Sequence, residues 1–184
     1  MSAWSEARIA SHVSRVVLGR RCILLVDRCN WTGHEADVLG VTMDGRLIDV
    51  EIKISRADLR ADIKKNKWWH RGWNASTRAY EPATPRLWPP KVWKHYYVMP
   101  AEIWRPELLE GLPAASGVLV ISEDRHGWVQ SRCVRRAKPC RDAYRLQPEQ
   151  MLDVARLANL RMWDARLDAE RRQPQRREYL WDVA

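Results

Sequence analysis

Five charged residues that could act on a phosphodiester lie in two nearby segments, Glu35-Ala36-Asp37 and Asp49-Val50-Glu51-Ile52-Lys53. Hydrolysis of such a bond needs a bound cation, an activated water and a group that holds this water in line. Carboxylate oxygens suit Mg²⁺, and a lysine ammonium can stabilise the charge of the transition state. We therefore predict that Asp37, Glu51 and Lys53 are catalytic. We expect the metal ligands to be Asp37, Glu51 and the Ile52 carbonyl.

A β-hairpin is predicted to bring these residues together, because two strand-like segments, 36–42 and 46–54, flank the turn-forming residues 43–45. A three-residue turn with Gly45 in the left-handed conformation places Asp37 opposite Glu51. A two-residue turn would put these two acids on different faces. We predict the three-residue turn because it separates a polar face, lining a cleft, from an apolar face that packs on a helix. The polar face holds Asp37, Asp49, Glu51 and Lys53, and the apolar face holds Val38, Ile48, Val50, Ile52 and Ile54.

Three other acids are supporting candidates. Glu35 and Asp49 are expected on the polar face, where either could bind a second cation or hold the first ligands from behind. Glu6, on a helix predicted over residues 4–18, could reach a metal through water. The alternative for Glu35 and Asp49 is a hydrogen-bonded or solvent-facing acid at a strand end.

A basic helix is predicted to follow the hairpin, from Ser55, with Asp58 as its capping-box partner, to about Trp68. Its cations recur at helical spacing. Such a stripe is usually a solvated face, but beside a carboxylate cleft it could hold phosphates. The candidate nucleic-acid-binding residues are Arg56, Arg60, Lys64 and Lys67, with Trp69 and Arg71 just beyond.

Residues 68–94 differ in composition from the rest of the chain, because tryptophans, cations and prolines alternate there. Since the prolines break any long regular element, we predict a loop or flap inserted in the core. Aromatic rings with cations suit stacking on unpaired bases. The alternative, expected for at least half of the tryptophans, is a small core under a long loop. The tryptophans are Trp68, Trp69, Trp73, Trp88 and Trp93.

The composition fits one basic α/β domain covering residues 1–184. The chain has 32 Lys and Arg against 23 Asp and Glu, a net charge of +9 and a pI near 9.8, which suits a polyanionic partner. Apolar spacing predicts a helix over 148–172 and a short helix or turn over 102–110. Short apolar runs predict strands over 21–27, 95–99, 117–122 and 127–134. No run is long enough to span a membrane, and a cytoplasmic location is expected by default.

The four cysteines form two pairs, each with six residues between its members. Their spacing differs from that of a common zinc knuckle, so reduced thiols are expected. A zinc site assembled from both pairs is the alternative that the sequence leaves open. The cysteines are Cys22, Cys29, Cys133 and Cys140.

The acidic segments resemble the signature of the PD-(D/E)xK, or restriction-endonuclease-like, nucleases: Asp37, then Glu51-Ile52-Lys53 closing a strand before a helix. Residues 33–68 are similar to small bacterial and phage-borne members, including MmcB-type DNA-repair proteins. The resemblance implies an αβββαβ core with a central mixed sheet flanked by helices, and Mg²⁺ or Mn²⁺ held by Asp37 and Glu51 with Lys53 catalytic. Ala36 stands where the family name has proline, and the tryptophan-rich insertion lies outside the common core.

Three functional hypotheses follow. The first is a Mg²⁺-dependent DNA endonuclease, selective for single strands or for DNA structure, acting in the cytoplasm of a bacterial or phage-infected cell. The second is a catalytically silent DNA-binding module on the same fold, and the third is a protein-interaction module. Because relatives that cut both strands often dimerise, a homodimer is a further alternative, for which the sequence identifies no dimer face.

Overall fold

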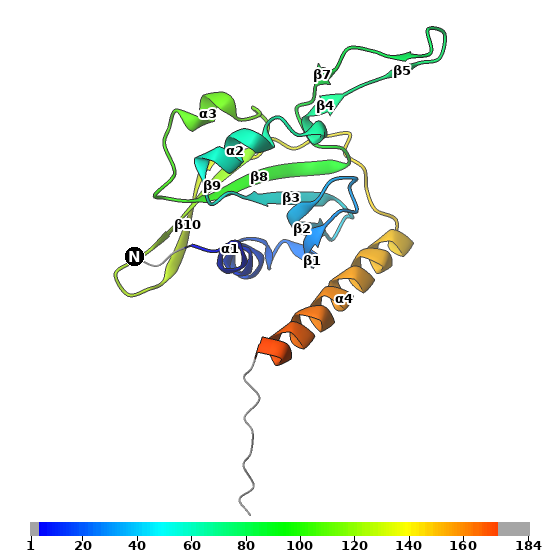
Figure 1. Cartoon of the computed structure of the whole chain (residues 1–184). Helices are drawn as coiled ribbons and strands as arrows, with labels where there is room; N and C mark the ends of the chain where they lie inside the picture. The colour runs from blue at the N-terminus through cyan, green and yellow to red at the C-terminus, as the bar shows by residue number, and fades with distance from the viewer. Residues whose placement is uncertain (1–3, 173–184) are drawn as a thin grey trace, which may run out of the picture.

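A six-stranded mixed sheet forms the centre of the protein in the computed structural model, which describes residues 4–172 of the chain (Figure 1). The strand order is β1-β2-β3-β8-β9-β10. β1, β2 and β3 are antiparallel in turn, β3, β8 and β9 are parallel, and β10 is antiparallel to β9. The bounds are β1 Cys22–Cys29, β2 Ala36–Thr42, β3 Leu47–Ile52, β8 Val92–Pro100, β9 Gly117–Glu123 and β10 Val129–Arg135. The predicted α/β class and central mixed sheet are confirmed.

Helices cover both faces of this sheet (Figure 1). On one face, α1 (Glu6–His12) and the π-helical turn η1 (Val13–Leu18) pack on apolar residues of β2, β3, β8 and β9. On the other face, α2 (Arg56–Asp62) and α3 (Leu108–Gly111) pack on β8 and β9, and α4 (Pro148–Arg172) packs against β1 and β2. The long C-terminal helix begins at Pro148, as its sequence pattern predicted, and continues to Arg172, the last described residue. No helix in the described part of the chain combines the length and apolarity needed to cross a membrane.

The register of the β2–β3 hairpin is the predicted one. Val38 pairs with Val50 and Leu39 with Asp49, so the next pair along the ladder is Asp37 with Glu51. The Thr42 amide donates to the Arg46 carbonyl at 2.9 Å, which leaves residues 43–45 as a three-residue turn. Gly45 has a φ of +75°, the left-handed conformation that this turn requires.

Both faces of the hairpin differ in part from the prediction. Ile54 does not belong to the apolar face: it is 42% exposed, because β3 ends at Ile52 and Ser55 already caps α2. The face with the acids is also not polar along its whole length. Leu39, Val41 and Leu47 lie on it and pack in a cluster with Val154 of α4. The charged residues occupy only the end of this face that α2 covers.

An arm extends from the body of the protein between α2 and β8 (Figure 1). It contains two short antiparallel ribbons, one of β4 (Trp69–His70) with β7 (Thr84–Pro85) and one of β5 (Trp73–Asn74) with β6 (Ala79–Tyr80). It begins directly after the 3₁₀ turn η2 (Asn66–Trp68). The predicted insertion therefore has regular structure at its base and near its tip.

Substituting Gly45→Ala tests the register of the hairpin. A Cβ at this position would lie 2.7 Å from the Leu146 carbonyl oxygen and would force a left-handed φ on alanine. We expect unfolding free energy to fall by about 1–3 kcal/mol in urea denaturation. Gly111→Ala is the matched control, because its Cβ would meet nothing within 4 Å. Equal stabilities of the two variants would contradict the turn geometry.

Candidate functional site

Asp37, Glu51 and Lys53 come together at the end of the hairpin that α2 covers. The Lys53 ammonium donates to Glu51 Oε2 at 2.9 Å, and the Ile52 amide donates to Asp37 Oδ2 at 2.6 Å. The first contact follows from the strand, because residues two apart project from the same face. The second holds the Asp37 carboxylate against the Ile52 peptide. The three predicted residues therefore form one group.

Asp62, at the end of α2, is the second acid of a buried charge network. Its carboxylate lies 3.3 Å from the Lys53 ammonium, 3.2 Å from that of Lys67 and 2.9 Å from that of Lys65. The Tyr97 hydroxyl donates to it at 2.8 Å. The Lys67 ammonium also donates to Glu51 Oε1. Glu51 and Asp62 are therefore joined through Lys53 and Lys67, and both acids are almost fully buried.

The predicted basic stripe is wrong at Lys67. This side chain is buried, because α2 ends at Asp62 and the chain turns before the 3₁₀ turn η2, which directs Lys67 toward the two acids. Arg56 is also engaged, since its guanidinium donates to the Ile103 carbonyl at 2.8 Å. Arg60 and Lys64 are exposed, as predicted.

The supporting acids have different environments. Asp49 is fully buried on the same face as Glu51, and its Oδ2 lies 2.8 Å from Nε2 of His34. Glu35 precedes β2 and is exposed, so it does not share the predicted strand face. Glu6 is exposed on α1, and its charge raises the pKa of Asp37 slightly.

Burial and neighbouring charges set the protonation of the site. Burial raises the pKa of Asp37 to about 6; the Ile52 amide opposes this and the charge of Glu51 adds to it. Burial alone would lower the pKa of Lys53, but Glu51 and Asp62 outweigh it and the net shift is upward. Burial alone would raise the pKa of Asp62, but Lys67 and Lys53 bring it below its usual range. Lys53 therefore stays protonated near neutral pH.

The donor set suits a divalent cation. Five carboxylates, of Asp37, Asp49, Glu51, Asp58 and Asp62, lie near three ammonium groups, of Lys53, Lys65 and Lys67. The carboxylates therefore outnumber the ammonium groups, and the charge of Glu51 adds to burial in raising the pKa of Asp37. Each carboxylate oxygen has two acceptor sites, so a Glu51 oxygen that accepts from lysine can still bind a cation. Asp37, Glu51 and the Ile52 peptide are the residues that could hold it between β2 and β3.

A surface cavity of about 480 Å³ adjoins the buried network. The segment before β2 lines it on one side, with His34 and Glu35, and the base of the arm lines it on the other, with Trp69 and Arg86. Lys65 and Lys67 complete the wall nearest the acids. The cavity is therefore lined by His34, Lys65 and Lys67, which contact Asp49, Asp62 and Glu51 in that order.

Sequence reasoning missed Asp62, His34, His95 and Tyr97 as parts of this region. Asp62 could have been found, because it lies three residues after Leu59 and so shares the buried face of α2. His95 and Tyr97 lie on β8, beside Asp49 and Glu51 of β3. The parallel pairing of these two strands across the arm has no local signal in the sequence.

The described residues do not form the four-cysteine zinc site that was the alternative to reduced thiols. Cys22 and Cys29 lie on β1, at one edge of the sheet, and Cys133 lies on β10, at the other edge. Within residues 4–172, a group of three or more His, Cys, Asp or Glu side chains with metal-binding geometry occurs only at Asp49, Glu51 and His95.

Comparisons with known proteins find a similarity in fold only. No protein-family model matches the chain, and no curated protein matches it. Among solved structures, the chain is similar to a protein of unknown function from Silicibacter pomeroyi, with 22% sequence identity, 94% of each chain covered and a TM-score of 0.53. The likeness shows a shared fold over nearly the whole chain.

The raised pKa of Asp37 predicts that Asp37→Asn stabilises the protein at alkaline pH. Because the folded-state pKa of about 6 exceeds the ordinary value of 3.8, ionising Asp37 costs stability as pH rises through this window. Asparagine keeps an oxygen for the Ile52 amide without the charge. In urea unfolding with a chelator, we expect a gain of about 1–3 kcal/mol at pH 8 and none at pH 4. A loss of stability at pH 8 would contradict the assigned environment.

Proposed function

We propose that the protein is a metal-dependent nuclease of the restriction-endonuclease-like kind that hydrolyses DNA phosphodiester bonds. The observation that carries this proposal is the position of Asp37 beside Glu51, with Lys53 hydrogen-bonded to Glu51 on the same strand face. The element order α1-β1-β2-β3-α2-β8 also agrees with the αβββαβ core that the sequence resemblance implies. Asp37 lies on β2, Glu51 on β3 and Lys53 directly after β3, which is the order that the resemblance implies.

Asp37 and Glu51 would hold Mg²⁺ or Mn²⁺, with the Ile52 carbonyl as a third ligand. Such a cation, when bound, offsets phosphate charge and lowers the pKa of a coordinated water. The Ile52 amide holds the Asp37 carboxylate beside the residue whose carbonyl would complete the ligand set. The chain thus supplies ligands from two adjacent strands, whose register is fixed by the turn at Gly45.

Lys53 acts in this proposal as a fixed positive charge. Because Glu51 and Asp62 keep it protonated, it cannot serve as a general base. A protonated ammonium can donate to a phosphate oxygen and stabilise the charge that develops there. Glu51 and Asp62 also restrict its movement.

The arm is proposed to bind the substrate strand. Trp69, Trp73 and Tyr80 are 41%, 57% and 69% exposed, which is unusual for rings of this size. Residues 69–94 carry several cations and one acid, Glu81. Exposed rings with cations stack on unpaired bases and contact the phosphates between them. The cavity at the arm base would lead a strand from the arm to the carboxylates.

A specific observation favours a second candidate, a catalytically silent DNA-binding module. Glu51 is only 1% exposed, and both of its oxygens accept from lysines, as in a purely structural ion network. Such a protein would keep the basic surface and the arm but would not cleave. The two candidates differ in a single measurement, cleavage with a divalent cation.

Cleavage of supercoiled plasmid, single-stranded DNA and branched DNA with Mg²⁺ or Mn²⁺ tests the proposal. We expect Glu51→Gln and Lys53→Met to lower the rate by about 100-fold or more, because each removes a charge that acts at the reacting phosphate. Glu110→Gln and Lys138→Met are matched controls at exposed positions and should cut at the wild-type rate. Cutting by Glu51→Gln at the wild-type rate would overturn the site, and a wild type that never cuts would favour the silent module.

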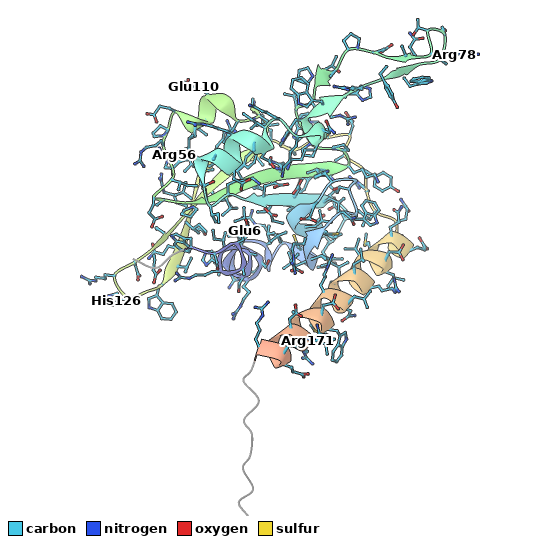
Figure 2. All side chains as sticks on the ribbon, in the orientation of Figure 1. Glu6, Arg56, Arg78, Glu110, His126 and Arg171 are labelled. Atoms are coloured by element: carbon cyan, nitrogen blue, oxygen red, sulfur yellow. The ribbon has the colours of Figure 1, made fainter. Side chains whose placement is uncertain are left out.

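Binding of fluorescent single-stranded DNA by a cleavage-deficient Asp37→Asn protein tests the arm. We expect an added Trp73→Ala substitution to weaken binding by about 5- to 100-fold, the loss of about 1–3 kcal/mol for one stacked base. Trp128→Ala is the matched control, because Trp128 is 73% exposed on the turn between β9 and β10. Figure 2 shows Arg78 at the arm tip and His126 of that turn at opposite ends of the molecule. Equal affinities of the two variants would exclude Trp73 from DNA binding.

A further inference from the structure

We infer that Asp49, Glu51 and His95 form an inner binding site for a divalent transition metal. Asp37 lies on β2, on one side of Glu51, whereas His95 lies on β8, on the other side of β3, where it pairs with Asp49. The inference deepens the proposed function, with which it shares Glu51. It adds two ligands, one of them an imidazole, that the sequence motif does not contain.

Strand pairing places the three side chains together. Asp49 on β3 pairs with His95 on the parallel strand β8, so the two residues are neighbours on one face of the sheet. Glu51 follows on that face two residues after Asp49. One ligand atom from each of the three lies within 4.8 Å of the others. Bonds of about 2.0–2.2 Å to a shared ion would need only a small contraction of this group.

Two buried atoms of this group lack a partner. Asp49 Oδ1 and His95 Nε2 have no hydrogen bond, although both residues are completely buried. An unsatisfied buried polar atom destabilises the fold, because the hydrogen bonds that it made with water are not replaced. A single cation would satisfy both atoms, because a carboxylate oxygen and an imidazole nitrogen are both metal ligands.

The other atom of each ligand is already held in place. His34 Nε2 lies 2.8 Å from Asp49 Oδ2, and Ser116 Oγ lies 2.9 Å from His95 Nδ1. Metal-binding histidines commonly have a hydrogen bond on the second ring nitrogen, which fixes the ring and leaves the first for the metal. His34 and Ser116 are therefore positioned as the supporting partners of such a site.

The ligand set selects the class of metal. Mg²⁺ prefers oxygen ligands and keeps most of its waters, which a completely buried site does not favour. One imidazole with two carboxylates suits Mn²⁺, Fe²⁺ or Zn²⁺. The surrounding network has five carboxylates against three ammonium groups, and this negative excess can accommodate the added charge.

Pulsed electron paramagnetic resonance of the full chain with Mn²⁺ tests the inference. Because the ligands are buried, the protein should be produced and purified with MnCl₂ present throughout, so that the ion can enter during folding. We expect nitrogen hyperfine coupling from one imidazole in the wild type. In His95→Gln this coupling should vanish, and Mn²⁺ affinity should fall about tenfold or more. His126→Gln, at an exposed position, is the matched control and should keep the coupling.

The wild-type spectrum decides the question even where His95→Gln does not fold. Absence of nitrogen coupling at saturating Mn²⁺ would overturn the inner site and leave a bridging water as the partner of the two atoms. Persistence of the coupling in folded His95→Gln would overturn it as well. Asp37→Asn separates this inference from the proposed function: we expect it to keep the coupling and lose cleavage. Coupling without any wild-type cleavage would defeat the nuclease proposal alone.

Discussion

The burial of Glu51 and Asp62 is the constraint on which the rest of the site depends. Removing two carboxylates from water is costly unless opposite charges accompany them. Lys53 supplies one such charge from the position directly after β3. The second charge comes from Lys67, and the chain must leave the helical path after α2 to deliver it. The same turn starts the arm, so the network anchors the arm at its base.

Local patterns predicted the parts of the fold that local chemistry determines. The turn at Gly45 has a single register that separates the charged residues from the apolar ones, and this fixed Asp37 beside Glu51. The start of α4 at Pro148 was predicted from the local pattern in the same way. The exposure of Ile54 was not predicted, because alternation of apolar and polar residues does not reveal where a strand ends and a helix cap begins.

Pairings between distant segments determined what the sequence could not predict. His95 joins the site only because β8 pairs in parallel with β3, after the chain has completed the whole arm. Lys67 was predicted to extend a solvent-facing stripe, because its spacing from Arg60 and Lys64 is helical. Lys67 is buried because its ammonium pairs with Glu51 and Asp62. These two acids lie close together only in the folded protein. The ion pairs with these acids, and not the helical spacing, therefore determine where the Lys67 side chain lies.

The central claim is that Asp37 and Glu51 jointly bind a divalent cation. A crystal structure of the protein grown with MnCl₂, measured for manganese anomalous scattering, tests it most directly. The predicted result is an anomalous peak in contact with the carboxylates of both Asp37 and Glu51. Crystals that contain manganese elsewhere but show no peak between these two carboxylates, with Lys53 and Lys67 still on Glu51, would contradict the claim.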